Sequence, residues 1–339
     1  MMARHAFVLV LALLGKAPAH AQQSVSDFYK GKSVDLYIGL SAGGVYDISA
    51  RLLSRHMGKY IPGNPTILPR QMEGAAGLRL ANWLYQLGPK DGTAIGTFAR
   101  GSAFDRLLGI QGATFDATKY NWIGSTNDEV SICAAWHTTG ITKMDQLYEK
   151  ELILGSTGGS GDDEQFPKLI RGVLGVKLRT VSGYPGGNEI KIAMERGEVN
   201  GRCGWSWSSV KATQGQWLKD KAISIFVQLS LRRHPDLPDV PMIMDLARTE
   251  EERQIFKLVF ARQVMAWPFV APPGVPMERL AALRKAFDDT MKDKEFLAEA
   301  DRLGLEITPV SGEKMQRLIS EIYETTPPAL AAKVAEMIK

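Results

Sequence analysis

The stretch VDLYIGLSAGGVYDISARLLSRHMGKY, residues 34–60, decides the fold of this chain. Residues 34–40 are an apolar run of strand length, and residues 46–60 repeat apolar side chains at helical spacing. Ser41-Ala42-Gly43-Gly44 lies between them. The pattern predicts a buried strand, a tight glycine turn and an amphipathic helix, which is the unit from which α/β sheets are built.

The same order of strand, glycine-rich turn and helix recurs further along the chain. One unit runs from residues 152–154 through the turn 155–161, and another from residues 178–181 through the turn 183–187. Other strands are predicted at residues 66–68, 93–98, 223–229 and 264–270, and long helices at 277–291 and 312–338, the last broken at Pro327-Pro328. Because ligands bind beyond the carboxyl ends of strands in open α/β sheets, we expect a cleft between two such sheets.

The first 21 residues have the pattern of a secretory signal peptide. Arg4 and His5 form a basic start, residues 6–14 are apolar, and Ala19-His20-Ala21 is a small-x-small cleavage site. The apolar run is too short to span a bilayer as a stable helix. We therefore expect cleavage after Ala21, and a mature chain of about 318 residues, long enough for two domains.

Charge argues against a nucleic-acid partner. The formal charge is +4, and removal of Arg4 and Lys16 with the signal leaves about +2. Nucleic-acid-binding proteins usually show a clustered basic face, and no basic or acidic block here exceeds a few residues.

The chain has two cysteines, Cys133 and Cys203. Export to an oxidising compartment and an even cysteine count favour a disulfide. The alternative is two buried free thiols. A disulfide would close a loop of roughly 70 residues and stabilise the fold by about 4 kcal/mol in the chain-entropy model.

The loop at Gly43-Gly44 is a candidate anion site. Glycines let backbone N–H groups converge, and the following helix adds its positive end, so a carboxylate or phosphate could bind there. Asp47 would then cap the helix or contact the ligand. The alternative is that the glycines only form a turn and that Asp47 only caps.

Two later turns offer similar chemistry. Residues 155–161 supply hydroxyls from Ser156, Thr157 and Ser160 and end in an acidic run at 162–164, which suits a helix N-terminus. We interpret this loop as holding one carboxylate or a neutral polar end. Tyr184-Pro185-Gly186-Gly187 is a third anion-friendly turn. Trp205 and Trp207 could wall a pocket or, equally well, pack in the core.

Enzyme signatures fail on inspection. Residues 26–33 end in Gly-Lys-Ser but lack the leading glycine of a P-loop and precede a strand. Gly159-Ser160-Gly161 begins a dinucleotide pattern, but Glu164 stands where its last glycine should be. Residues 204–208 miss the last position of a nucleophile elbow. The mature chain's histidines do not pair at metal-ligand spacing. We therefore predict no catalytic site, no metal and no cofactor.

Six landmarks, in order, carry a family resemblance. They are residues 41–53 (SAGGVYDISARLL), 73–77 (EGAAG), 89–93 (PKDGT), 184–187 (YPGG) with 196–200 (RGEVN), 233–241 (RHPDLPDVP) and 271–276 (APPGVP). From about Phe28 to the C-terminal helix, the chain resembles the periplasmic receptors of tripartite tricarboxylate transporters, often called Bug proteins.

The resemblance implies a two-lobed α/β flytrap fold of the periplasmic-binding-protein type, which grips a small carboxylate between its lobes. The positions that match the family's two gripping loops, together with the neighbouring aromatic side chains, are Ser41, Gly43, Gly44, Tyr46, Asp47, Ser156, Gly158, Ser160, Gly161, Tyr184 and Trp205. It also implies a periplasmic, monomeric, non-enzymatic protein that delivers its ligand to membrane permease subunits.

The predicted division places lobe one at residues 22–126 plus 230–339 and lobe two at residues 127–229. Ile123 and Phe226 are expected on crossing strands. Two other functions stay open from the sequence. One is a secreted α/β hydrolase or lyase, which would need a nucleophile–base pair in the cleft, and the other is a ligand sensor for a membrane signalling protein.

Overall fold

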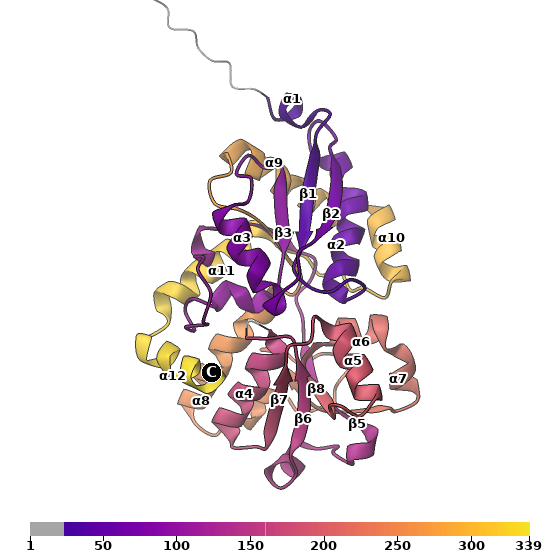
Figure 1. Cartoon of the computed structure of the whole chain (residues 1–339), viewed down its shortest axis with the longest axis vertical. Helices are drawn as coiled ribbons and strands as arrows, with labels where there is room; N and C mark the ends of the chain where they lie inside the picture. The colour runs from indigo at the N-terminus through magenta and orange to yellow at the C-terminus, as the bar shows by residue number, and fades with distance from the viewer. Residues whose placement is uncertain (1–23, 160) are drawn as a thin grey trace, which may run out of the picture.

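Residues 24–159 and 161–339, described by a computed structural model, form two lobes stacked along the long axis of the molecule (Figure 1). Lobe one carries a six-stranded sheet with the order β11-β4-β10-β3-β1-β2, and lobe two a five-stranded sheet with the order β7-β6-β8-β5-β9. The predicted two-lobed α/β architecture is confirmed. The predicted signal peptide, residues 1–21, and Ser160 lie outside the described residues.

The sheet of lobe one is parallel on one side and antiparallel on the other. β1 pairs in parallel with β2 and β3, whereas β10 and β11 run antiparallel to β4. The strands are β1 (Ser33–Ile38), β2 (Thr66–Gln71), β3 (Ala94–Thr97), β4 (Asn121–Ser125), β10 (Pro268–Ala271) and β11 (Val310–Ser311). The helices are α1 (Val25–Tyr29), α2 (Val45–His56), α3 (Leu78–Gln86), α9 (Met277–Thr290), α10 (Lys294–Arg302) and α11 (Gly312–Thr325).

The apolar pattern that decided the fold packs as its periodicity requires. Val34, Leu36 and Ile38 of β1 are fully buried, and Leu52 and Leu53 of α2 lie in the same core. Alternation along the strand and the three- to four-residue repeat along the helix bring these side chains to one interface. The carboxyl end of β1 therefore delivers the glycine turn to the edge of the lobe.

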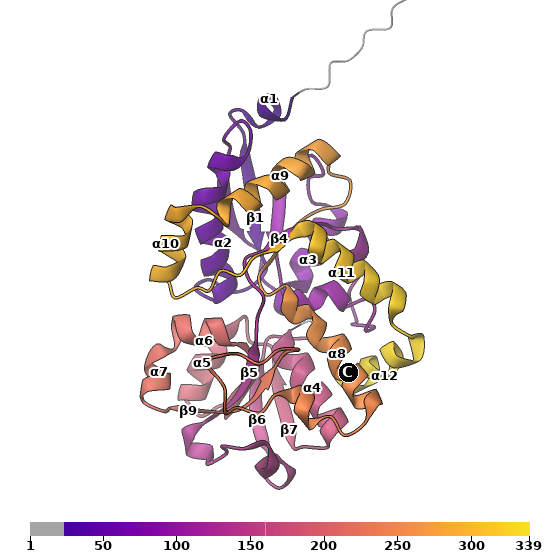
Figure 2. The same cartoon turned by 180° about the vertical axis from the view of Figure 1, so that it is seen from behind.

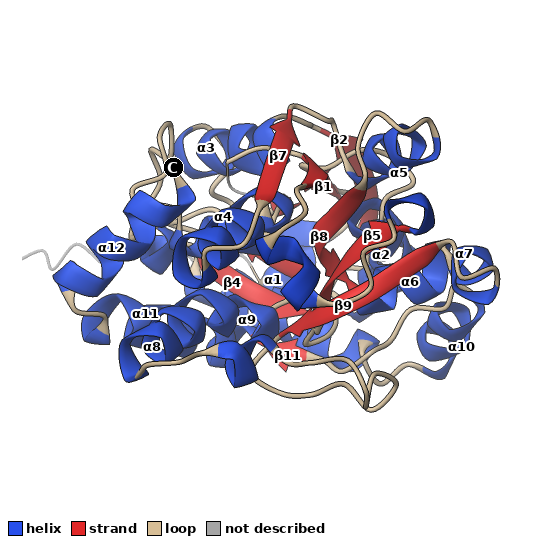
Figure 3. Cartoon of the chain, turned by 90° about the horizontal axis from the view of Figure 1, so that it is seen from below, coloured by secondary structure: helices blue, strands red, loops and turns tan. Residues whose placement is uncertain are grey.

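Lobe two repeats this arrangement with an added antiparallel pair. β6 lies parallel to β7 and β8, and β5 lies antiparallel to β8 and β9. Figure 3 shows β8, β5 and β9 side by side in this sheet. The strands are β5 (Ser131–Trp136), β6 (Leu152–Ser156), β7 (Leu178–Ser182), β8 (Gly201–Ser206) and β9 (Ile223–Leu229). The helices are α4 (Asp162–Leu174), α5 (Gly187–Glu195), α6 (Trp207–Thr213) and α7 (Gly215–Lys219); α8 (Glu250–Phe260), from the segment predicted for lobe one, lies against α4.

The predicted disulfide is present. Cys133 of β5 and Cys203 of β8 are joined across neighbouring antiparallel strands, with their Cα atoms 3.9 Å apart. Both cysteines are fully buried. The bond ties β8, the central strand of the sheet and the one that also carries Arg202 and Trp205, to its neighbour β5.

The C-terminal helices connect the two lobes. The predicted break at Pro327-Pro328 separates α11 from α12 (Pro328–Ile338), and α12 lies beside α4 of lobe two (Figure 2). Lys168 of α4 donates a hydrogen bond to the backbone oxygen of Lys339, at 2.6 Å. α8 also packs on lobe two, where Phe260 meets Phe166. The division of the chain into lobe one and lobe two at residues 126/127 and 229/230 remains a prediction.

One predicted strand begins later than expected. Residues 264–270 were expected to be extended, but Ala261–Val264 form a 3-10 helix and β10 begins at Pro268. Arg262 Nε donates to the backbone oxygen of Val259, which holds the turn in place. Across the described residues, no helix combines the length and the apolar character needed to cross a membrane.

Candidate ligand-binding site

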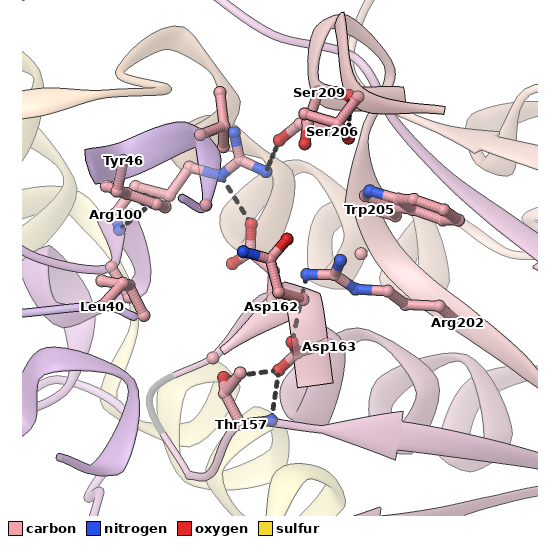
Figure 4. Close-up of a pocket in the computed structure, with 18 of the residues that line it drawn as sticks. Leu40, Tyr46, Arg100, Thr157, Asp162, Asp163, Arg202, Trp205, Ser206 and Ser209 are labelled. Atoms are coloured by element: carbon pink, nitrogen blue, oxygen red, sulfur yellow. Dashed lines mark hydrogen bonds and ion pairs between the residues drawn. The ribbon is translucent and has the colours of Figure 1, made fainter. Parts of the chain in front are cut away.

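A cavity of about 80 Å³ lies where the two lobes meet (Figure 4). Lobe one contributes the start of α2, the residues after β3 and the residue before β10. Lobe two contributes the starts of α4 and α5, the strand β8 and the helix α6. The lining residues of lobe one are Leu40, Gly44, Val45, Tyr46, Ala99, Arg100 and Trp267, and those of lobe two include Thr157, Gly161, Asp162, Asp163, Asn188, Lys191, Arg202, Trp205, Ser206 and Ser209.

Asp47 organises the glycine loop after β1. Its Oδ2 accepts a hydrogen bond from the backbone N–H of Gly43 at 2.9 Å, and its Oδ1 accepts bonds from Arg51 Nε at 2.8 Å and Gln71 Nε2 at 2.7 Å. Gly43 has φ +73°, a left-handed conformation that favours glycine. The carboxylate of Asp47 therefore shapes the loop and the first turn of α2.

The sequence predicted that the backbone amides of Gly43 and Gly44 would be free to bind an anion, but in the structure the free amides are those of the next two residues. The N–H of Gly43 is bonded to Asp47, and that of Gly44 donates to the backbone oxygen of Ser41 at 3.3 Å. Gly44 itself has φ −76°, so its backbone places no special demand on the residue type. The amides of Val45 and Tyr46 have no acceptor among the described residues, and both residues line the cavity.

Tyr46 is built into the wall of the cavity. Its hydroxyl accepts a hydrogen bond from the backbone N–H of Arg100 at 3.1 Å, and its ring meets Trp267 edge to face at 4.7 Å. Burial raises the pKa of the Tyr46 hydroxyl to about 12. Tyr46 is therefore a neutral side chain in the wall of the cavity.

Arg100 joins the lobes across the cavity. It follows β3 in lobe one, is only 3% exposed, and donates from Nε to Asp162 Oδ2 of lobe two at 2.5 Å. Its Nη2 donates to Ser131 Oγ at 2.7 Å and Ser206 Oγ at 3.3 Å. Burial alone would lower the pKa of Arg100, but the charge of Asp162 raises it above its ordinary value.

The sequence predicted that the acidic run at the start of α4 would cap that helix. In the structure these carboxylates bind other partners instead. The N-cap is Gly161, which has no side chain to donate or accept. Asp162 pairs with Arg100 and, at 3.4 Å, with Arg262. Asp163 Oδ1 accepts bonds from the amide and hydroxyl of Thr157, and Glu164 pairs with Lys168 at 2.7 Å. For Asp162, the two buried arginines outcompete the helix end because each pairing also compensates a desolvated charge.

Two polar contacts hold the first glycine loop against lobe two. Ser41 Oγ donates to Glu189 Oε2 at 3.2 Å, and Asn188 Nδ2 donates to the backbone oxygen of Ala42 at 3.0 Å. Both partners belong to the first turn of α5. The structure is therefore that of a closed pair of lobes.

The predicted ligand residues fall into three groups. Gly44, Tyr46, Gly161 and Trp205 line the cavity, whereas Ser41, Gly43, Asp47 and Ser156 lie behind it in the loops that shape it. Gly158 and Tyr184 line a separate groove between the lobes, together with Glu73, Gly74 and Ala75. Ser160 lies outside the described residues. Trp205 lines the cavity and also packs in the hydrophobic core of lobe two, where it is 1% exposed.

Three cationic side chains of the cavity were missed from the sequence: Arg100, Lys191 and Arg202. Arg202 lies in a strand, Lys191 in a helix and Arg100 in the 3-10 turn after β3, and none of them is part of a recognisable local motif. Arg202 Nη2 lies 3.6 Å from Asp163 Oδ2, and burial lowers the pKa of Arg202.

Two clusters outside the cavity bring together residues of metal-ligand type. They are His56, Asp293 and Glu295, and His234, Asp236 and Glu306. A lysine neutralises each cluster: Lys59 Nζ lies 2.6 Å from Asp293 Oδ2, and Lys211 Nζ lies 2.8 Å from Asp236 Oδ2 and also contacts Glu306. Ion pairing accounts for both clusters.

Comparison with known proteins shows the fold. No family model and no curated protein sequence matches the chain. Among solved structures, it is similar to the periplasmic binding protein BugD, with a TM-score of 0.71 and 20% identity over 89% of this chain and 96% of that one.

Two further similar structures contain ligands. Rpa4515 of R. palustris with adipate has a TM-score of 0.70 and 19% identity over 90% of this chain and 98% of that one. MatC of Rhodopseudomonas palustris with bound malate has a TM-score of 0.70 and 18% identity over 91% and 99%. The chain therefore has the two-lobed fold of the Bug-type periplasmic binding proteins that its sequence resembles.

Proposed function

We propose that this protein is an extracytoplasmic receptor that captures a small carboxylate and delivers it to the membrane permease of a tripartite tricarboxylate-type transporter. One observation carries the proposal: three helices, α2, α4 and α5, begin at one cavity between the lobes. Helix N-termini offer unpaired N–H groups and positive potential, and both favour a bound anion.

The proposed contact in lobe one is the start of α2. We place one ligand carboxylate against the amides of Val45 and Tyr46, beside Gly44. The neighbouring structures that hold adipate and malate support a small organic acid as the ligand class. The cavity of about 80 Å³ is small beside the few hundred Å³ typical of ligand pockets, which favours a compact ligand.

In the proposed transport cycle, the lobes close to retain the ligand and open to release it. Ser41–Glu189 and Asn188–Ala42 are contacts of the closed state, so opening must break them before the ligand can leave. A permease could then distinguish loaded from empty receptor by the relative position of the lobes. We propose that the protein acts in the periplasm, as a monomer and without catalysis.

A thermal-shift screen of mono-, di- and tricarboxylates, aromatic acids and acidic amino acids tests the proposal. A ligand at about 100 times its dissociation constant should stabilise the protein by roughly 2.7 kcal/mol. Isothermal titration calorimetry then measures the affinity of each hit. A protein stabilised by no carboxylate in the screen would contradict the proposed function.

Gly44→Val tests where the carboxylate binds. A Cβ at residue 44 would lie 3.2 Å from the backbone oxygen of Ser41 and beside the proposed anion position. Losing two hydrogen bonds to a charged group, at about 1.5–3 kcal/mol each, should weaken binding a hundredfold or more. The matched control is Gly215→Val, where a Cβ meets nothing within 4 Å. Normal binding by a folded Gly44→Val protein would place the carboxylate elsewhere.

A further inference from the structure

Three of the residues that line the cavity each carry a buried hydrogen-bond donor that has no acceptor among the described residues. They are Arg100 Nη1, Arg202 Nε and Trp205 Nε1. In Figure 4 the guanidinium group of Arg100 comes from one side of the pocket, and the guanidinium group of Arg202 and the indole nitrogen of Trp205 come from the opposite side. Among the described residues that line the cavity, every buried side-chain atom left without a partner is a donor.

Unpaired donors are unusual enough to need a cause. Buried polar groups in folded proteins are nearly always hydrogen-bonded, because an unpaired one loses its water contacts and gains nothing. One such atom could be an accident of packing. Three that converge on one cavity indicate that an acceptor group belongs between them.

The charge of the cavity identifies that acceptor as an anion. The lining residues include three cations, Arg100, Lys191 and Arg202, and only two acids, Asp162 and Asp163. Asp162 is shared with a further cation, Arg262, which lies behind it. Lys191 forms no ion pair or hydrogen bond among the described residues, so its charge is uncompensated by direct contact.

The surroundings of Lys191 agree with this assignment. Burial first, and then the charge of Arg202 on β8, lower the pKa of its ammonium group, against the opposing effect of Glu195 and Glu189 on its own helix. An anion placed beside Lys191 would raise the pKa of its ammonium group again and so stabilise its charge. The two acids of the cavity disfavour a highly charged anion, which leaves a carboxylate as the group of matching size and charge.

We infer that Arg100, Lys191, Arg202 and Trp205, the donor cluster, form a second anion subsite that binds the distal carboxylate of a dicarboxylate ligand. The inference rests on the proposed function, in which the first carboxylate binds the start of α2. The guanidinium fork suits the two oxygens of a carboxylate, and the indole N–H adds a single directed donor. The receptor would then select diacids over monoacids through side chains of lobe two and Arg100.

Calorimetry with matched ligands tests the donor cluster. The full mature protein is titrated with dicarboxylates of four to six carbons, malate and adipate among them, and with the monoamide of each. The monoamide keeps the shape of the ligand but loses one negative charge. We expect the diacid to bind tenfold to a hundredfold more tightly, as for a hydrogen bond to a charged group.

Two variants assign the difference to the cluster. Trp205→Phe removes the indole N–H and keeps a large aromatic ring, and Lys191→Gln removes the charge. Each should weaken diacid binding about tenfold and leave monoamide binding unchanged. The controls are Trp83→Phe, on a helix of lobe one away from the cavity, and the exposed Lys314→Gln; neither should alter either affinity.

The outcomes separate the two proposals. Equal affinity for diacids and monoamides would overturn the donor cluster and leave the receptor function standing. Equal loss of both ligands in Trp205→Phe and Lys191→Gln would show a structural role and also overturn it. If neither diacids nor monoamides bind but another carboxylate of the thermal-shift screen does, the donor cluster is overturned and the receptor function stands; only a protein that binds no carboxylate of the screen would overturn both. Should Trp205→Phe not fold, the Lys191→Gln result decides.

Discussion

The two lobes contribute to the cavity in different ways. Lobe one presents backbone and apolar surface, chiefly at Leu40 and residues 44–46 of one strand–turn–helix unit, together with Ala99, Trp267 and the single cation Arg100. Lobe two presents charged and polar side chains from several elements, among them Asp163 of α4, Lys191 of α5 and Arg202 of β8. The main part of the lobe-one half is local in the sequence, whereas the lobe-two half is assembled by the fold from several elements.

This difference predicts different sensitivities. A site made of backbone amides depends on the conformation of one loop and tolerates most side-chain changes around it. A site made of side chains from separate strands and helices depends on the sheet that holds them in register. Variants in each half of the site can test this contrast, and loss of the disulfide should have the largest effect.

Removing the disulfide should damage the half of the site in lobe two. Replacing both Cys133 and Cys203 by alanine should lower the free energy of unfolding by about 4 kcal/mol, because the bond closes a long loop of the unfolded chain. Ligand affinity should fall as well, since β8 carries Arg202 and Trp205. Chemical denaturation and calorimetry measure the two effects.

A direct check accompanies this prediction. Thiol titration of the unreduced, denatured protein should find no free thiol. Unchanged stability and affinity in the double alanine variant would mean that the sheet alone holds β8, and would weaken the contrast between the lobes.

Arg100→Met removes the cation that lobe one sends across the cavity. Asp162 would keep only its 3.4 Å contact with Arg262, and leaving a buried charge short of its partner costs about 3 kcal/mol. We expect a lower free energy of unfolding and a more open molecule by small-angle X-ray scattering.

Arg179→Met is the matched control for that variant. Arg179 is half-exposed and pairs with Glu151 at 3.2 Å within lobe two, so its loss should cost less than about 1 kcal/mol. If both variants behave alike, Arg100 does not hold the lobes together.

Gly43→Ala tests the backbone half of the site. An L-residue at φ +73° is strained by about 1–2 kcal/mol, and the added Cβ would also lie 3.1 Å from Asn188 Nδ2 of lobe two. Gly44→Ala, at φ −76°, should be milder. Thermal denaturation of the two variants compares them, and equal destabilisation would refute a conformational role for Gly43.

The smallest expected effect is a pH dependence of the free energy of unfolding, caused by His234 in the segment that follows β9. Burial lowers the pKa of His234, whose Nδ1 accepts the N–H of Asp236 at 3.0 Å. A base with a lowered pKa stabilises the fold above its ordinary value of 6.5, and this contribution is lost as pH falls through the lowered pKa.

Denaturation at several pH values measures this contribution. Acidification through this range should therefore reduce the free energy of unfolding. His234→Gln should flatten that slope, whereas a change at the exposed His137 should not. A slope that persists in His234→Gln would assign the effect to other groups.

The sequence alone determined the features that depend on near neighbours. Apolar periodicity predicts β1 and α2, Gly43-Gly44 predicts the turn between them, and Pro327-Pro328 predicts the break between α11 and α12. The even cysteine count predicts the disulfide without geometry. These inferences succeed because backbone conformation and helix or strand periodicity depend on residues only a few positions apart.

Only the tertiary structure decided which side chains share the cavity. Arg100 meets Asp162 across 62 positions of sequence, and Ser41 meets Glu189 across 148. Whether the acids of α4 cap a helix or pair with arginines depends on what lobe closure buries beside them. Burial and long-range pairing set that balance of charge and desolvation, and neither is written in the local pattern of residues.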